Sequence, residues 1–168
     1  MNASPVRFAL TFAVLQTLLT GAVEAWANDM MLADAQQKIT RAGARASVTG
    51  STENFTGQVR VEPVWSVDEN SNVSGGLVSF EPGARSAWHT HPAGQRLVVI
   101  SGVGLTQEWG KPVQQIRPGD VIWCPPGVKH WHGAAPNSPM THLAVTGTVN
   151  GKNVSWMEKV TDEQYDAR

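Results

Sequence analysis

The chain has 168 residues, with 13 lysines and arginines against 14 aspartates and glutamates, and a single cysteine. No basic stripe and no acidic tail stands out, so the charge pattern argues against a nucleic-acid partner. Cys124 has no second cysteine with which to form an internal disulfide, and its apolar neighbours favour a buried thiol. The length predicts one domain with a hydrophobic core of its own.

Residues 1–27 have the pattern of a secretory signal peptide. Arg7 supplies a positive charge, a mostly apolar run follows from residue 8 to residue 23, and Ala25-Trp26-Ala27 is a small-x-small cleavage site. The apolar run is shorter than the ~20 residues that a membrane-spanning helix needs, so an uncleaved anchor is the less favoured alternative. We therefore expect an exported protein, periplasmic or secreted, without a membrane attachment after cleavage.

Residues 28–54 are rich in alanine and polar side chains with little periodicity, which predicts an N-terminal arm or linker. From residue 55 to residue 168 we expect the folded domain. Its first strand is indicated by the alternation of Val59, Val61, Pro63 and Trp65 with other residues. Further short runs predict strands at Gly76–Glu81, Ser86–His91, Arg96–Ile100, Gly104–Trp109, Val113–Ile116, Asp120–Trp123, Lys129–His132 and Met140–Thr148.

Turn sequences rich in glycine and proline separate these runs, for example Glu81-Pro82-Gly83 and Pro125-Pro126-Gly127. Many short strands at regular spacing predict an all-β sandwich or barrel, and the absence of alternating long helices argues against a parallel α/β sheet. The pattern Thr161-Asp-Glu-Gln164 is a capping box and predicts a short C-terminal helix.

All five histidines fall between positions 89 and 142. Residues two apart in a strand face the same side, so His89 and His91 are expected to point together, as are His130 and His132, with His142 on another strand. Burying five imidazoles without partners would cost several kcal/mol, and a metal ion removes that cost for the rings that bind it. Trp88 and Trp131 alternate with the histidines and should pack on the opposite faces of their strands.

The spacing of these residues is more specific than their number. Gly83-x5-His89-x-His91-x3-Gln95-x6-Gly102 is followed by Gly119-x5-Pro125-x-Gly127-x2-His130. Over residues 58–148 the chain resembles the cupin superfamily, which implies a jelly-roll barrel that holds one divalent metal ion. Carried over residue by residue, the resemblance implies the ligands His89, His91, Gln95 and His130. The family usually has Glu at the position of Gln95 and Asn at that of Ala134.

A closer resemblance is carried by the runs 80–92, 130–136, 140–144 and 156–165. They are similar to the bacterial cupin hydroxynitrile lyases, which implies manganese as the metal and His132 and His142 as acid/base groups. The residues alone leave the metal open, because nitrogen-rich ligation favours Ni, Cu or Zn by affinity, and Fe also suits such sites. Arg85 and Lys129 near the motifs are expected to be solvated or ion-paired at strand ends.

Three neutral imidazoles and an amide would leave the charge of a divalent ion uncompensated, which favours Lewis-acid chemistry on a bound hydroxyl. Together with the resemblance, this implies a metal-dependent lyase that cleaves a cyanohydrin to an aldehyde or ketone and hydrogen cyanide or catalyses the reverse addition, or that acts on a related small hydroxy or carbonyl compound. Two alternatives stay open: a dioxygenase or other oxidoreductase using Fe, Ni or Cu, and a non-catalytic exported cupin that binds a small molecule or a metal. Strand alternation predicts a small-molecule substrate pocket lined by Gly76, Val78, Leu97, Val99, Ala144 and Thr146. The resemblance also implies a homodimer or homotetramer.

Overall fold

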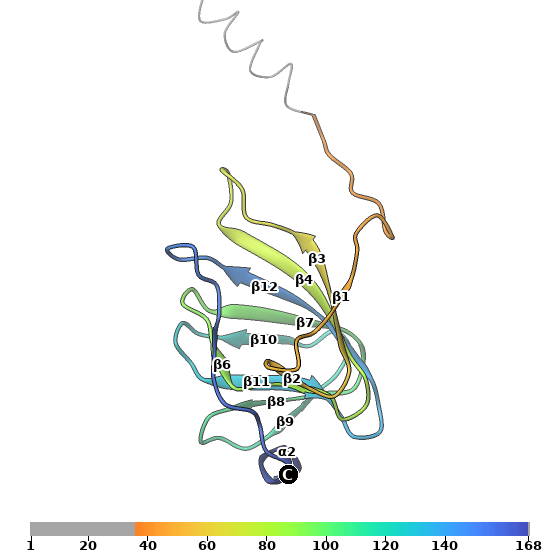
Figure 1. Cartoon of the computed structure of the whole chain (residues 1–168), viewed down its shortest axis with the longest axis vertical. Coiled ribbons are helices and arrows are strands. Elements are labelled where there is room, and N and C mark those ends of the chain that lie inside the picture. The colour runs from red at the N-terminus through yellow and green to blue at the C-terminus, as the bar shows by residue number, and fades with distance from the viewer. Residues whose placement is uncertain (1–35, 168) are drawn as a thin grey trace, which may run out of the picture. The chain divides into compact units, whose positions relative to one another are not determined.

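The structure, a computed structural model, describes residues 36–167 (Figure 1). The expected signal peptide and the first residues of the expected arm lie outside the described residues. All strands belong to the compact unit that runs from Arg41 to the C-terminus. Within residues 36–167, no helix is both long enough and apolar enough to cross a membrane.

Six strands form the first sheet, in which every neighbouring pair is antiparallel. In spatial order the sheet consists of β1 (Val48–Thr49), β3 (Val59–Trp65), β4 (Val73–Phe80), β12 (Met140–Gly147), β7 (Gln95–Gly102) and β10 (Val121–Cys124). Because β1 pairs with β3, the sheet already begins within the segment 28–54 that was expected to be an arm.

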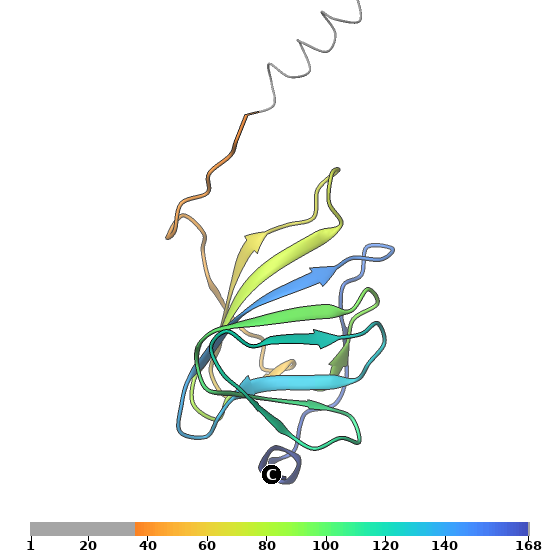
Figure 2. The same cartoon turned by 180° about the vertical axis from the view of Figure 1, so that it is seen from behind.

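Seven strands form the second sheet, which faces the first (Figure 2). Its members are β13 (Ser155–Trp156), β6 (His89–Thr90), β11 (His130–Ala134), β5 (Arg85–Ser86) and β2 (Phe55–Thr56), with β8 (Gly104–Glu108) beside β11 and β9 (Gln114–Ile116) beside β8. A single short helix, α2 (Asp162–Asp166), follows at the C-terminal end of the described chain. The predicted all-β architecture with a short C-terminal helix is confirmed.

Each predicted run contains a strand, but the run 86–91 is broken into β5 and β6. The break occurs because the intervening backbone bonds to distant segments: Ala87 N donates to Asn54 O, and Trp88 N donates to Glu158 O. Three strands of two residues each, β1, β2 and β13, were not predicted, since so short a segment carries no periodicity of its own.

The interior is filled from both sheets by a buried apolar cluster. Its larger members are Val59, Val78, Phe80, Val99, Ile116 and Met140. A second cluster lies on the other face of the second sheet, under the C-terminal segment, and contains Trp88, Leu105, Trp131, Ala135, Val160 and Tyr165. Strand β11 is therefore buried on both faces, with its histidines toward one side and Trp131, as predicted, toward the other.

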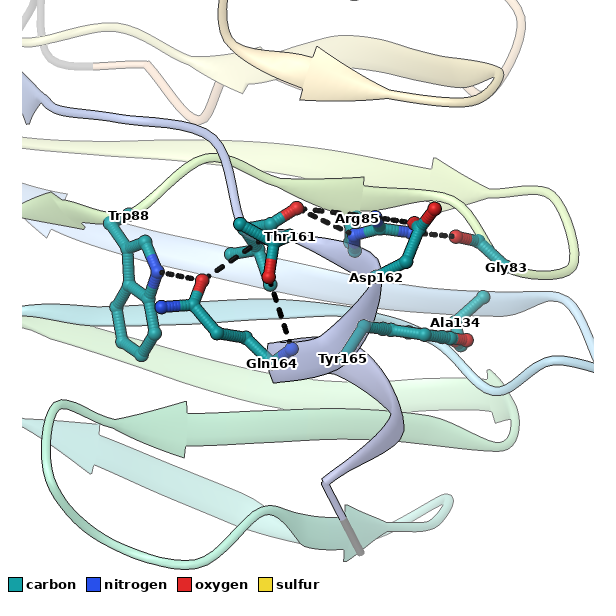
Figure 3. Close-up of polar contacts among 9 residues, drawn as sticks. Gly83, Arg85, Trp88, Ala134, Thr161, Asp162, Gln164 and Tyr165 are labelled. Carbon is teal, nitrogen blue, oxygen red and sulfur yellow. Dashed lines mark hydrogen bonds and ion pairs between the residues drawn. The ribbon is translucent and has the colours of Figure 1, made fainter.

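The C-terminal segment is attached to the second sheet by hydrogen bonds as well as by apolar contact (Figure 3). The Tyr165 hydroxyl donates to Ala134 O at 2.7 Å, and the Trp88 indole N–H donates to Gln164 Oε1 at 3.1 Å. The predicted capping box at Thr161 is confirmed. Together these bonds satisfy the polar atoms that the aromatic cluster would otherwise bury without partners.

Arg85 is ion-paired, which was one of the two expected states, but it is buried rather than solvated. Its guanidinium donates to Asp162 Oδ1 at 2.5 Å and to the Val160 carbonyl, and it lies over the Tyr165 ring (Figure 3). Lys129 pairs with a carboxylate on the same C-terminal segment. Cys124 is buried, as predicted, and burial raises the pKa of its thiol to about 11.

Replacing Thr161 with alanine should lower the free energy of unfolding by about 1 kcal/mol, since the variant loses the side chain that accepts from the Gln164 backbone N–H. Urea unfolding followed by tryptophan fluorescence measures the loss. Thr161→Ser keeps the hydroxyl and should match the unsubstituted protein. Equal destabilisation by both changes would contradict the capping role.

Candidate metal centre

Three strands and one turn bring the five histidines together. His89 on β6 and His130 on β11 are direct cross-strand partners, and their ring centroids are 4.3 Å apart. His132 follows on β11, His142 projects from β12, and His91 lies just after β6. All five side chains are at most 4% exposed. Such a concentration of buried polar rings requires partners for their nitrogen atoms.

Backbone carbonyls fix the tautomer of three of the rings. The Nδ1 atoms of His89, His91 and His130 lie 2.9, 2.5 and 2.9 Å from the carbonyl oxygens of Ala87, Asn153 and Val128. A carbonyl oxygen only accepts, so each Nδ1 must carry the proton. Each Nε2 is then left with a lone pair, which is the arrangement that orients histidine ligands toward a metal ion.

The Nε2 atoms of two of these rings are in environments that a cation would improve. His91 Nε2 is buried without a hydrogen-bond partner. His130 Nε2 lies 3.2 Å from Gln95 Oε1, and with the proton on Nδ1 both atoms are acceptors. Two lone pairs that face each other in a buried site repel, whereas a metal ion bound by both would make the contact favourable. The donor set therefore fits a divalent ion.

His132 and His142 are held differently. His132 Nδ1 and His142 Nε2 are 3.0 Å apart, so one ring donates to the other rather than to the backbone. His142 Nδ1 is buried and has no hydrogen-bond partner. These two rings form a buried imidazole pair in which a proton can move between nitrogen atoms of similar basicity.

Burial dominates the electrostatics of the whole cluster. Desolvation lowers the pKa of His130 to about 4 and that of His142 to about 3. The pKa values of His89, His91 and His132 are lowered for the same reason, and at His89 and His132 neighbouring imidazoles add to the effect. All five rings are therefore neutral at neutral pH and available as lone-pair donors or proton acceptors.

Two overlapping histidine triads could hold an ion. Ring nitrogens of His89, His130 and His132 all lie within 4.8 Å of one another. The triad expected from the sequence replaces His132 with His91, whose ring centroid is 5.0 Å from that of His89 and 5.6 Å from that of His130. The hydrogen bonds favour the latter triad, because its three rings share the same backbone-fixed tautomer while His132 is bonded to His142.

A cavity of about 370 Å³ opens onto four of the five histidines, all except His130. Of the pocket residues expected from strand alternation, Gly76, Val78, Ala144 and Thr146 line it, as do His89, His91, Gln95, His132 and His142. Leu97 and Val99 are buried inward as their alternation implies, but they lie in the packed interior and do not reach the cavity. Alternation gives the face of a strand, not the position along the barrel at which the interior is open.

The apolar walls of the cavity were missed by sequence reasoning. They are Phe55, Val61, Pro63, Trp65, Val154 and Trp156. Alternation along β3 could have indicated Val61 and Pro63, but not Trp65, because the register shifts between Pro63 and Trp65. Trp156 could not have been found in this way, because β13 has two residues and reaches the site only by pairing with β6.

Comparison with known proteins agrees with this geometry. The family described as Cupin domain matches residues 76–146. The chain is also 54% identical, over 128 residues, to the (R)-mandelonitrile lyase of Granulicella tundricola, covering 76% of this chain and 98% of that protein. The chain belongs to the cupin family. The predicted jelly-roll barrel is thereby confirmed, and this cupin is a relative of a lyase.

Solved structures show the same fold. A cupin-like protein from Thermotoga maritima is 42% identical and superposes with a TM-score of 0.66, covering 77% of this cupin and 95% of that chain. The polyketide cyclase RemF from Streptomyces resistomycificus superposes with a TM-score of 0.62 at 13% identity, covering 78% and 92% of the two chains. The second likeness shows the fold alone.

Metal binding distinguishes the two triads. If His91 is a metal ligand, His91→Ala should weaken binding of Mn²⁺ at least about a hundredfold. That is more than the effect of removing a residue that only hydrogen-bonds to a ligand. His132→Ala should change it much less. Calorimetric titration of protein freed of metal by chelation gives both constants, and elemental analysis gives the stoichiometry. Loss of binding in His132→Ala with retention in His91→Ala would assign the ion to the other triad.

The metal-free protein should lose stability as the pH falls from about 6.5. The five histidine pKa values are lowered in the folded protein, so the unfolded chain takes up protons first as the pH falls. Each histidine that stays neutral in the folded protein therefore adds about 1.4 kcal/mol per pH unit to the loss of unfolding free energy. Urea unfolding between pH 7 and pH 5 measures the slope. His142→Gln should reduce it by about one such increment, and a flat profile would show that the rings are charged inside the fold.

Proposed function

We propose that this cupin is a metal-dependent carbon–carbon lyase that cleaves a cyanohydrin to a carbonyl product and hydrogen cyanide or catalyses the reverse addition, or that acts on a related small hydroxy or carbonyl compound. One observation carries the proposal: a chain 54% identical to an (R)-mandelonitrile lyase has the buried His132–His142 pair on the same cavity as His89, His91 and Gln95. The two sets of groups are suited to different tasks.

We propose His89, His91, Gln95 and His130 as ligands of one divalent ion, with manganese inferred from the resemblance. When bound, an ion with only neutral ligands supplies an uncompensated positive charge that acidifies a hydroxyl and stabilises developing negative charge. The protein's part is to hold the proton on Nδ1 of the three rings through the carbonyls of Ala87, Asn153 and Val128, so that each Nε2 keeps its lone pair.

The histidine pair handles the proton. In the tautomer in which His132 Nδ1–H donates to His142 Nε2, the other nitrogen of His132 has a free lone pair and accepts the hydroxyl proton of the cyanohydrin. The bond between the carbinol carbon and the nitrile carbon then breaks, and its electron pair leaves with cyanide. The imidazolium, stabilised by its neighbour, returns the proton to cyanide and the pair is regenerated neutral. Both rings are neutral beforehand, because burial lowers their pKa values.

The cavity suits a small uncharged substrate. Its lining contains no Asp, Glu, Lys or Arg among the described residues, and its apolar walls lie beside the histidines. A hydroxyl and a nitrile can face the imidazoles while an organic substituent contacts the apolar wall. Water is excluded from most of this surface by the substrate itself, which strengthens the hydrogen bonds of the histidine pair.

The manganese-loaded protein should release cyanide from mandelonitrile without oxygen. His132→Ala and His142→Ala should each lower kcat/KM by about two to four powers of ten, the usual contribution of a positioned acid/base group. A colorimetric cyanide assay on matched, metal-saturated samples measures the rates. Trp123→Leu, on the outer surface of β10, serves as the control variant and should retain the unsubstituted rate.

Unchanged rates in both histidine variants, or no cyanide from the loaded unsubstituted protein, would reject the lyase proposal. Oxygen uptake by the iron-loaded protein with an enol substrate would support the oxidative alternative instead. Gln95→Glu adds a graded test: a carboxylate neutralises one unit of charge, so binding of the ion should persist while cyanide release slows.

A further inference from the structure

One wall of the cavity is a tryptophan whose ring rests on a glycine. Trp65 ends strand β3, and its Cα partner on β4 is Gly75. A Cβ atom added at Gly75 would lie 2.4 Å from both Cη2 and Cζ3 of the Trp65 ring. The six-membered ring therefore lies against bare backbone, in a place where any side chain at residue 75 would force it to move.

Two further features hold the ring in that place. The register of β3 against β4 shifts between Pro63 and Trp65, and an irregularity of this kind re-aims the side chains that follow it. The Trp65 indole N–H donates to the Val73 carbonyl at 3.1 Å. Because this bond satisfies the only polar atom of the side chain, the remaining ring surface is apolar.

That surface is available to a ligand. Trp65 lines the cavity and is 41% exposed, whereas the packed Trp88 and Trp131 are 1% and 0% exposed. Trp156 also lines the cavity and contacts Phe55 edge-to-face at 5.5 Å. A partly exposed, hydrogen-bonded indole in the wall of a cavity is suited to stacking against a flat apolar group.

We propose that Trp65, positioned by Gly75, is a specificity-determining wall that selects a planar aryl substituent over a saturated ring of similar size. The inference rests on the proposed function for the reaction. It adds the residue that contacts the substituent of the substrate and distinguishes one substituent from another. A planar ring can stack on the fixed indole, while the thicker, puckered cyclohexyl ring cannot make the same contact.

Binding tests the wall without turnover. Benzyl alcohol should bind the unsubstituted protein about two- to tenfold more tightly than cyclohexylmethanol, the range expected for one aromatic pair. Competition by ligand-observed NMR gives the ratio. Trp65→Leu, which keeps an apolar side chain, and Gly75→Ala, which leaves the tryptophan intact but displaces it, should both bring the ratio close to one.

Trp123 provides a matched control. It is 46% exposed, and a Cβ added at Gly94 would lie 2.4 Å from its ring, so it too rests on a glycine, yet it does not line the cavity. Trp123→Leu should leave the ratio unchanged. A ratio near one in the unsubstituted protein, or one that survives Trp65→Leu, overturns the inference. If Gly75→Ala fails to fold, Trp65→Leu decides alone.

Turnover separates this inference from the proposed function. The ratio of kcat/KM for mandelonitrile over cyclohexanecarbaldehyde cyanohydrin should fall in Trp65→Leu by the same factor as the binding ratio. If neither compound yields cyanide but the binding ratio depends on Trp65, the lyase proposal is rejected and the role of Trp65 in selecting the substituent is supported. If cyanide is released and neither ratio changes in Trp65→Leu, the role of Trp65 is rejected and the lyase proposal is supported.

Discussion

Five neutral imidazoles packed inside one barrel are the constraint on which the rest of this structure depends. Each ring loses its hydration on folding, and two ring nitrogens, His91 Nε2 and His142 Nδ1, gain no hydrogen bond in return. The cluster is thus a local cost to stability. The aromatic cluster on the other face of β11 offsets it, since it buries Trp88 and Trp131 almost completely and satisfies both indole N–H groups.

The backbone divides the histidines into two kinds. Carbonyls of Ala87, Val128 and Asn153 hold the proton on Nδ1 of three rings and so leave the opposite nitrogen with a lone pair that could bind a metal ion. His132 and His142 bond to each other instead, and a proton can move between the two rings. An identical side chain is thus suited to bind an ion or to carry a proton according to the partner of a single nitrogen atom.

Sequence patterns indicated most of this site, and the reasons for the omissions are physical. Motif spacing located the histidines, and strand alternation placed Trp88 and Trp131 correctly on the face opposite to them. Alternation could not show that Leu97 and Val99 lie in the packed interior while Trp65 lines the cavity. It does not give the position of a residue along the barrel axis, and the register shift before Trp65 cannot be read from the sequence. Nor could it show the burial of Arg85, whose partners come from the C-terminal segment.

The parts of the chain that we propose for chemistry and for selectivity are separate. The segment that matches the family, residues 76–146, contains all five histidines. The apolar walls contributed by Phe55, Trp65 and Trp156 lie outside it, on strands that come before and after. Asn153, which orients His91 through its carbonyl, belongs to the later segment too, so that segment shapes both the cavity and one proposed ligand. Changes in the flanking strands can therefore alter which substituent fits while the histidine arrangement inside the barrel is retained.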